Sequence, residues 1–295
     1  MHKVVVGTGY TGKRVLDSLP GATGISRSRR PGFGDRRIIT CDLDDPAIDP
    51  VVFEEAFALL YTVPPARDSI EDKRLARLLN AFTRAPSRIV YISTSAVYGD
   101  HGGHLIDEST PPAPALPRSR RRFAAERLLV DYCANTNAAL VVLRVPGIYG
   151  PYRLGLKRIE DQVAIIREQD AHPGNRIHVD DLAACCIAAL DDEAVTGVIN
   201  VGDGDYRSGS WFTNQVAAMA GLPAPPQISR EQALATFSPK RLSFLSEARK
   251  LDTRRMREDL GVTPLYADPL AGIRASLLEE GRTPATEAPA ETSDD

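Results

Sequence analysis

The sequence predicts an α/β protein with a doubly wound parallel sheet and a smaller, mostly helical C-terminal lobe. Short β-branched runs alternate with helical stretches up to about residue 200, a pattern typical of a parallel sheet covered by helices on both faces. A glycine-rich turn follows the first apolar run, Val4-Val5-Val6, directly. The last 80 residues are helical and rich in proline, which predicts a lobe over the carboxyl edge of the sheet.

The elements follow from runs of apolar residues and from their end signals. The expected strands are 2–6, 23–26, 37–40, 58–63, 88–93, 139–143, 176–179 and 197–201. The expected helices are 12–19, 69–84, 119–136, 156–168, 180–191, 210–220, 229–236, 253–260 and 267–280. Asp252 and Ser210 are placed to begin two of these helices, and Gly261 and Gly221 to end them.

The composition excludes several classes of protein. The 295 residues are 43% hydrophobic and 25% charged, with a net charge of −3 and a pI near 6.0, which argues against a general binder of nucleic acid or membrane surfaces. No apolar run approaches the ~18 residues of a membrane span, and we expect no signal peptide because the chain enters a strand at once. Cys41, Cys133, Cys185 and Cys186 lack metal-ligand spacing, so we expect free thiols, no metal and a cytoplasmic protein.

The glycine-rich turn predicts a site for a dinucleotide. A strand that ends in Gly-x-Gly-x-x-Gly and opens into a helix is built to hold a pyrophosphate, because glycines allow a tight turn and a close backbone approach. The free N–H groups at the helix start then face the anion. The alternative is a glycine-rich turn with a structural role only. The expected contacts are Gly7, Thr8, Gly9, Tyr10, Thr11 and Gly12, with Thr62 at the end of a neighbouring strand.

The residues after the second expected strand favour NADP(H) over NAD(H). An NAD site usually places a carboxylate about 20 residues beyond the glycines, and here the chain has none between Asp17 and Asp35. Arginines and hydroxyls suit a 2′-phosphate, which requires charge-assisted donors; a solvated basic loop is the alternative. Asp42 is placed to meet the adenine amino group. The residues expected at the 2′-phosphate are Ser26, Arg27, Ser28 and Arg29.

Five motifs in order resemble the extended short-chain dehydrogenases/reductases of the NAD-dependent epimerase/dehydratase family, whose sheet is of the Rossmann type. They span residues 2–202 and include, after the glycine turn, a strand-end motif, an acidic Pro-rich loop, a segment expected beside the nicotinamide, a strand-to-helix step and a last paired strand. The motifs are Tyr91–Asp100, Asp107–Pro111, Arg144–Pro151, Arg176–Leu182 and Gly197–Gly202. The resemblance implies that Pro146, Gly147 and Ile148 contact the cofactor.

The same resemblance exposes a degenerate catalytic set. The family uses a Ser/Thr to orient the reacting oxygen, a Tyr as acid/base and a Lys four residues later. Thr94 matches the first of these. With Glu126 as anchor, Arg118 stands at the Tyr position and Arg122 at the Lys position. Arg122 is suited to hold the nicotinamide ribose, but a guanidinium stays protonated and cannot be an acid/base. These departures, with Val6 in place of an extra leading glycine, resemble an atypical branch of the family.

Substitutes for the missing acid/base exist, each with a structural alternative. Tyr98 and Tyr149 flank the expected cleft, although such tyrosines also pack as wall residues. His178 is a second candidate base and equally a buried structural residue. His101 and His104 lie in a Gly-rich loop, where they could coordinate a metal or contact the substrate. The alternative is a solvated loop without either role. Tyr152, Arg153 and Arg158 fall where the family contacts the anionic part of its substrates.

The sequence therefore predicts three regions and leaves two functions open. Residues 1–202 are expected to form the NAD(P)-binding domain, with a substrate-lobe insertion at about 151–175; residues 203–280 form the C-terminal lobe and 281–295 a disordered tail. One hypothesis is an NADP-dependent oxidoreductase or epimerase acting on a small carbonyl or sugar-like substrate. The other is a non-catalytic dinucleotide-binding sensor or interaction protein. The resemblance also implies a homodimer formed through helices 69–84 and 119–136.

Overall fold

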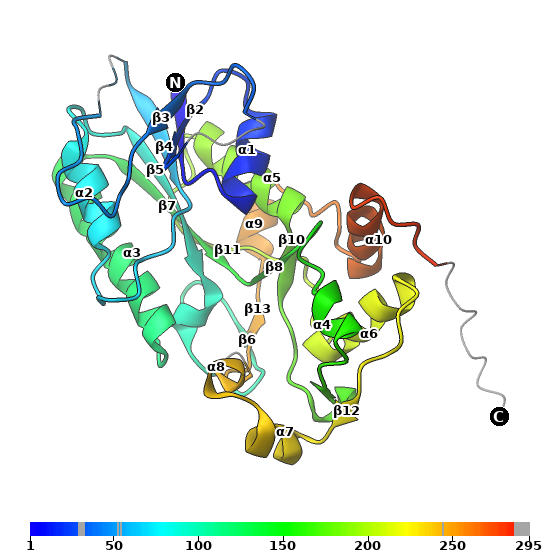
Figure 1. Cartoon of the computed structure of the whole chain (residues 1–295). Coiled ribbons are helices and arrows are strands. Elements are labelled where there is room, and N and C mark those ends of the chain that lie inside the picture. Colours follow the sequence, from blue (N-terminus) through cyan, green and yellow to red (C-terminus); the bar gives the residue numbers. More distant parts are fainter. Residues whose placement is uncertain (29–32, 52, 54, 244, 286–295) are drawn as a thin grey trace, which may run out of the picture.

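The computed structural model describes residues 1–28, 33–51, 53, 55–243 and 245–285. Seven strands form one sheet in the order β11-β7-β5-β4-β1-β2-β3 (Figure 1), and every pair in it is parallel. The predicted doubly wound α/β fold is therefore confirmed. The strands are β1 (His2–Val6), β2 (Thr23–Ser26), β3 (Ile38–Thr40), β4 (Phe57–Tyr61), β5 (Arg88–Thr94), β7 (Ala139–Val145) and β11 (Gly197–Asn200).

Helices cover both faces of this sheet, because alternate side chains of each strand point to opposite faces. Val5 belongs to the core that includes Val15 of α1 (Tyr10–Ser18) and Leu182 of α5 (Val179–Asp191). Val4 and Val6 belong to the opposite core, which α2 (Lys73–Ala81) and α3 (Pro117–Thr136) cover. Both faces are apolar, as the continuous Val4-Val5-Val6 run predicts.

The C-terminal lobe lies beside the carboxyl ends of the strands (Figure 1). Its helices are α4 (Leu156–Glu160), α6 (Gly209–Met219), α7 (Arg230–Thr236), α8 (Pro239–Leu242) and α10 (Pro269–Glu279), and α9 (Arg254–Glu258) packs against the main core. Three short parallel pairs lie outside the central sheet. The pair of β6 (Leu105–Ile106) with β13 (Lys250–Leu251) joins the sheet domain to the lobe. The pair of β9 (Ile165–Ile166) with β12 (Gln227–Ile228) lies within the lobe, and β8 (Gly147–Tyr149) pairs with β10 (Arg176–His178) on either side of the 151–175 segment. Two single 3₁₀ turns, η1 (Ser95–Tyr98) and η2 (Glu168–Asp170), complete the described elements.

Several local predictions differ from the structure. The run 176–179 is not part of the central sheet; β10 pairs only with β8, and Val179 already opens α5. The helix predicted over 156–168 ends at Glu160, because Gln162 adopts a left-handed conformation with φ 51°. Ser208, not Ser210, caps α6 by accepting from the Trp211 N–H.

The helix predicted over 253–260 is α9, and its N-cap is Thr253, not Asp252. Asp252 accepts a hydrogen bond from the Arg254 N–H at 2.9 Å in the adjoining turn. At the other end of the lobe, the Ala285 N–H donates to the Met219 carbonyl at 2.8 Å, so the chain still contacts the lobe there. The rest of the predicted tail, 286–295, lies outside the described residues. In the described part of the chain, no helix is both long enough and apolar enough to cross a membrane.

The strand order places a switch point between β1 and β4. From β1 the chain runs outward through β2 and β3, and from β4 it runs the other way through β5, β7 and β11. Connections that leave in opposite directions open a crevice at the carboxyl ends of the two central strands, where doubly wound proteins bind ligands. Gly7 follows β1 and Thr62 follows β4, so the glycine-rich turn lies at this crevice.

Candidate functional site

Two of the three glycines in the turn are required by close packing. Gly7 has φ 88°, and a Cβ there would lie 2.5 Å from Thr62 Oγ1. Thr62 closes the turn by donating to the carbonyl of Gly7 at 2.8 Å. A Cβ on Gly12 would lie 1.9 Å from that same carbonyl oxygen. The turn and the first turn of α1 are therefore in backbone contact, as the motif predicts.

Gly9 has the opposite surroundings. It is the N-cap of α1, and a Cβ at this position would meet nothing within 4 Å. The first turn of α1 contains no acidic residue, and its leading N–H groups have no partner within the helix. Open space in front of free amides and a helix N-terminus fits a pyrophosphate. The residues present therefore fit a dinucleotide.

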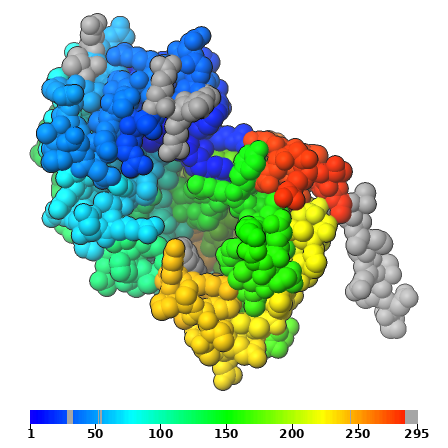
Figure 2. All heavy atoms as spheres, viewed as in Figure 1, coloured from blue at the N-terminus to red at the C-terminus, as the bar shows by residue number. Residues whose placement is uncertain are grey.

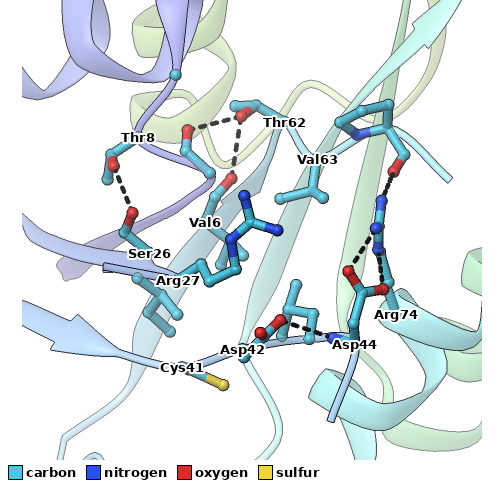
Figure 3. Close-up of a pocket in the computed structure, with 15 residues that line it drawn as sticks. Val6, Thr8, Ser26, Arg27, Cys41, Asp42, Asp44, Thr62, Val63 and Arg74 are labelled. Atoms are coloured by element: carbon cyan, nitrogen blue, oxygen red, sulfur yellow. Dashed lines mark hydrogen bonds and ion pairs between the residues drawn. The ribbon is translucent and has the colours of Figure 1, made fainter. Parts of the chain in front are cut away.

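A cavity of about 300 Å³ begins at this turn and runs past the ends of β2, β3 and β4 (Figure 3). Ser26 stands at the end of β2, and its hydroxyl accepts from Thr8 at 2.9 Å. Arg27, which is exposed, follows it along the wall. Seven predicted cofactor residues line this cavity: Gly7, Thr8, Gly9, Ser26, Arg27, Asp42 and Thr62.

The far wall of the cavity is an ion pair that the sequence analysis missed. Arg74 of α2 donates to both carboxylate oxygens of Asp44, at 2.6 Å each, and to the Pro64 carbonyl at 3.2 Å (Figure 3). The pairing with Arg74 lowers the pKa of Asp44. The pair links the loop after β3 to α2. Asp44 follows Asp42 by two residues, but no spacing rule connects it with Arg74, 30 residues later.

The other predicted cofactor residues do not line this cavity. The Tyr10 hydroxyl donates to the Pro151 carbonyl at 2.9 Å, and Arg153 stacks on its ring at 3.9 Å. Thr11 is buried within α1. Ser28 and Ile148 lie outside the lining, and Arg29 lies outside the described residues. Tyr10 and Thr11 thus contribute packing at the helix start.

A second cavity of about 530 Å³ lies between the sheet domain and the C-terminal lobe. Figure 2 shows the surface hollowed between the N-terminal half of the chain, the green segment and the orange one. Thr94 at the end of β5 lines it, together with Pro146 and Gly147 after β7. The structure therefore brings three of the predicted nicotinamide-side residues to one cavity.

Arginines dominate the walls of the second cavity. The described lining includes five arginines and a single carboxylate, Glu247. The arginines are Arg118, Arg158, Arg230, Arg241 and Arg249. Because guanidinium groups stay charged and match the oxygens of phosphate and carboxylate groups, this cavity suits an anionic ligand. Arg158 was predicted here from its place in the sequence, whereas the three from 230 onward carry no recognisable motif.

The two arginines at the family's Tyr and Lys positions are anchored by the protein. Arg118 donates to the Ser243 hydroxyl at 2.6 Å and to the Ser243 carbonyl at 2.5 Å. Arg122 donates to the Ile92 carbonyl at 2.9 Å and to the Tyr91 hydroxyl at 3.3 Å, and it lines neither cavity. The structure gives Arg122 a role in holding α3 against β5. Arg118 alone of the pair reaches the arginine-rich cavity.

The two tyrosines proposed as proton donors are buried away from the cavity. Tyr98 donates to Asn200 Oδ1 at 2.8 Å and stacks under Arg144. Burial raises the pKa of Tyr98 and of Tyr149. Tyr149 packs edge-on against His178 and Phe212 in the lobe core. In the structure both tyrosines pack as wall residues, which is the structural alternative named for them, and a catalytic role for Tyr98 stays a prediction.

The candidate histidines also have structural roles. His178 is buried, which lowers its pKa, and its Nδ1 accepts from the Asp180 N–H at the start of α5. His178 is therefore the N-cap of α5, and Asp180 lies in the first turn of that helix. His101 and His104 contact the Tyr98 and His101 carbonyls. Among the residues described, no cluster of three potential metal ligands occurs.

Comparison with known proteins finds both a family and related structures. The family model described as the NAD dependent epimerase/dehydratase family matches residues 4–202. A dTDP-glucose 4,6-dehydratase of Neisseria gonorrhoeae is 28% identical over 198 residues, which cover 62% of this chain and 56% of that protein. The chain spans still less of two relatives from Arabidopsis thaliana, 31% and 38% of their lengths.

Solved structures are similar over nearly the whole chain. A functionally unknown conserved protein from Silicibacter pomeroyi has a TM-score of 0.76 and 28% identity, with 94% of this chain and 98% of that chain covered. A UDP-glucose 4-epimerase structure has a TM-score of 0.73 at 16% identity, covering 97% and 100%. The protein MoeE5, solved in complex with UDP-glucose and NAD, has a TM-score of 0.71 at 19% identity, covering 95% and 100%. At these identities, the last two similarities show a shared fold and no more.

Proposed function

Because the chain belongs to the NAD dependent epimerase/dehydratase family, we propose that it is an NADP-dependent enzyme that oxidises or reduces a sugar-like substrate carrying a negative charge. One arrangement carries this proposal. The dinucleotide cavity and the arginine-rich cavity both lie at the carboxyl edge of the sheet, and Thr94 with the Pro146-Gly147 segment lines the second. A bound nicotinamide would exchange hydride with the substrate.

Thr94 is the residue proposed to orient the reacting oxygen. Its Oγ1 accepts from the Ala96 N–H at 3.3 Å, which leaves the hydroxyl hydrogen available for a ligand. A hydroxyl that donates to a substrate oxygen stabilises the charge that develops there when a proton or hydride moves. In Thr94→Ala this donor is lost, while the dinucleotide cavity remains intact.

We expect Thr94→Ala to lower the hydride-transfer rate by about 10- to 100-fold, the value of one hydrogen bond to a developing charge. Thr94→Ser should retain the rate. Thr213→Ala is the matched control, because Thr213 lines the same cavity but donates to its own helix at Gly209. Single-turnover measurements of nicotinamide absorbance report the rate. Unchanged turnover in Thr94→Ala would refute this role.

The NADP preference is proposed from the wall at the end of β2. Ser26 occupies the place where an NAD site has a carboxylate, and exposed Arg27 lines the same cavity. A 2′-phosphate brings about two negative charges that Arg27 is suited to receive. Asp42 and Asp44 also line the cavity, but Asp44 is already paired with Arg74.

Arg27→Ala is expected to weaken NADPH binding by about 10- to 100-fold, as befits the loss of charge-assisted hydrogen bonds, and to leave NADH binding unchanged. Arg84→Ala removes an exposed arginine outside both cavities and serves as the control. Calorimetric titration with both nucleotides measures the affinities. Equal affinity of the unmodified protein for NADH and NADPH would refute the preference.

Sugar nucleotides are the substrate class that this proposal tests first. Relatives carry names such as dTDP-glucose 4,6-dehydratase, and the excess of arginine over carboxylate in the second cavity suits a diphosphate. Titration with UDP-glucose, UDP-glucuronic acid and dTDP-glucose, with NADP⁺ present, tests it. Saturable binding followed by a change in nicotinamide absorbance supports the enzyme.

A sensor without chemistry is the second candidate function. The observation that favours it is the arginine at the family's tyrosine position, which Ser243 anchors in place. Tight dinucleotide binding with no absorbance change for any sugar nucleotide or carbonyl compound would favour the sensor. Binding of neither nucleotide would refute both candidates.

A further inference from the structure

We propose that Glu247 is the acid/base of the arginine-rich cavity and takes the place of the missing tyrosine. This inference rests on the proposed function, because it assigns a proton carrier to the same reaction. Glu247 lies in the segment between α8 and β13, where the sequence shows no catalytic motif. Its side chain is 7% exposed and belongs to the lining of the cavity.

Few of the described residues that line this cavity have a side chain that can both donate and accept a proton. Guanidinium groups do not release a proton in proteins, and alcohol hydroxyls are too weakly acidic to act alone. Tyr98 and Tyr149 are buried elsewhere. Glu247 and His172 remain as the described lining side chains of the types that serve as general acids and bases in enzymes.

The two oxygens of the Glu247 carboxylate differ in their contacts. One oxygen, Oε2, accepts from Arg249 at 3.1 Å. The other, Oε1, is buried and has no hydrogen-bond partner among the residues that the structure describes. A buried carboxylate oxygen without a donor is costly, and a ligand hydroxyl in the cavity would supply that donor. No atom of His172 is among the buried polar atoms without a partner in the described part of the chain.

Glu247 also lies close to Arg118 and to the segment that follows Thr94. Glu247 lies near Arg118, and its charge counteracts the effect of burial on the pKa of that guanidinium. Arg118 occupies the family's tyrosine position and lines the same cavity as Thr94. Arg249, which holds Glu247, is itself fixed to the Gly99 carbonyl at 2.5 Å, just after η1. The carboxylate is thus tied to the segment that follows Thr94.

The reaction balances with these groups. In the oxidising direction, a sugar hydroxyl transfers its proton to Glu247 Oε1, and the carbon that bears it loses hydride to oxidised NADP⁺ or NAD⁺. The O–H and C–H bonds break and a C=O bond forms, leaving Glu247 protonated and the dinucleotide reduced. In the reducing direction, Glu247 returns the same proton. Thr94 holds the oxygen throughout.

The test separates binding from proton transfer with two variants. Glu247→Gln retains an acceptor but cannot take a proton, so we expect UDP-glucose to bind within about threefold of the wild-type affinity and hydride transfer to fall by about 10²- to 10⁴-fold. Glu247→Ala also loses the acceptor. It should bind UDP-glucose about 10- to 100-fold more weakly and bind UDP, which has no sugar hydroxyl to donate, as the wild type does.

Calorimetry measures the affinities, and single-turnover absorbance measures the rate. The control is Glu71→Gln, on an exposed residue just before α2. Equal rates in wild type and Glu247→Gln would overturn the assignment. Equal weakening of UDP and UDP-glucose in Glu247→Ala would overturn it as well, as would a rate lost in His172→Gln but kept in Glu247→Gln. If the wild type binds neither UDP-glucose nor dTDP-glucose, the proposed substrate class fails first, and Glu247 loses its role with it.

Discussion

Replacing Arg144 by methionine is expected to lower the free energy of unfolding by about 3–5 kcal/mol, the cost of leaving a buried charge without its partner. Arg144, near the end of β7, and Glu126 of α3 each expose only 5% of their side chains. Two guanidinium nitrogens donate to Glu126, at 2.8 and 3.3 Å. Ser93 also donates to this carboxylate, but one hydroxyl cannot balance a full buried charge.

Urea unfolding of the variant measures this loss. A second variant, Glu126→Leu with Arg144→Met, removes both charges and should recover a large part of it, because paired apolar replacements are often neutral. Recovery would show that the single variant fails through the unpaired carboxylate and not through lost packing on Tyr98, which Arg144 covers at 4.5 Å. A loss below about 1 kcal/mol in Arg144→Met would contradict the prediction.

Replacing Asp203 by asparagine is expected to stabilise the protein at pH 8 by as much as about 4 kcal/mol and to have little effect near pH 4. Asp203 follows β11 and is 7% exposed; burial raises its pKa from 3.8 to about 7. Oδ1 accepts from the Asp205 N–H at 2.9 Å, whereas Oδ2 has no partner within the described part of the chain. Asparagine preserves the acceptor and never carries the charge.

The sign follows from which state binds the proton. Between about pH 4 and pH 7 the folded protein holds the Asp203 proton while the unfolded chain has lost it, so the free energy of unfolding falls as pH rises through this range. Urea unfolding at both ends of the range tests this. Asp131→Asn, on an exposed residue of α3, is the control. A variant that is no more stable than wild type at pH 8 would contradict the prediction.

These two residues lie at the carboxyl edge of the sheet, where the cavities also lie. Asp203 follows β11, and Arg144 is one residue from the end of β7. The Pro146-Gly147 segment of the second cavity continues directly from β7. Asp203 therefore places a carboxyl whose ionisation reduces stability next to the site, a pattern that is common where a fold also carries a function.

Several residues that line the dinucleotide cavity were predicted from the sequence, and others were not. Gly7, Gly9 and Ser26 were assigned from their distance to a strand end, because parallel strands meet at one edge. That distance is local, so the assignment needs no knowledge of packing. The Asp44–Arg74 pair was missed, since it joins the loop after β3 to α2, and the relation of the two depends on how that helix packs.

The sequence by itself determined the fold class, the glycine turn and the family, because alternating apolar runs and turn glycines act over a few residues at a time. Only the tertiary structure decided the walls of the second cavity. Thr94, Arg118, Arg230 and Glu247 come from segments that are up to 153 residues apart in the chain, and charged residues in such segments look like ordinary solvated surface. These side chains line one cavity only because the lobe packs over the edge of the sheet.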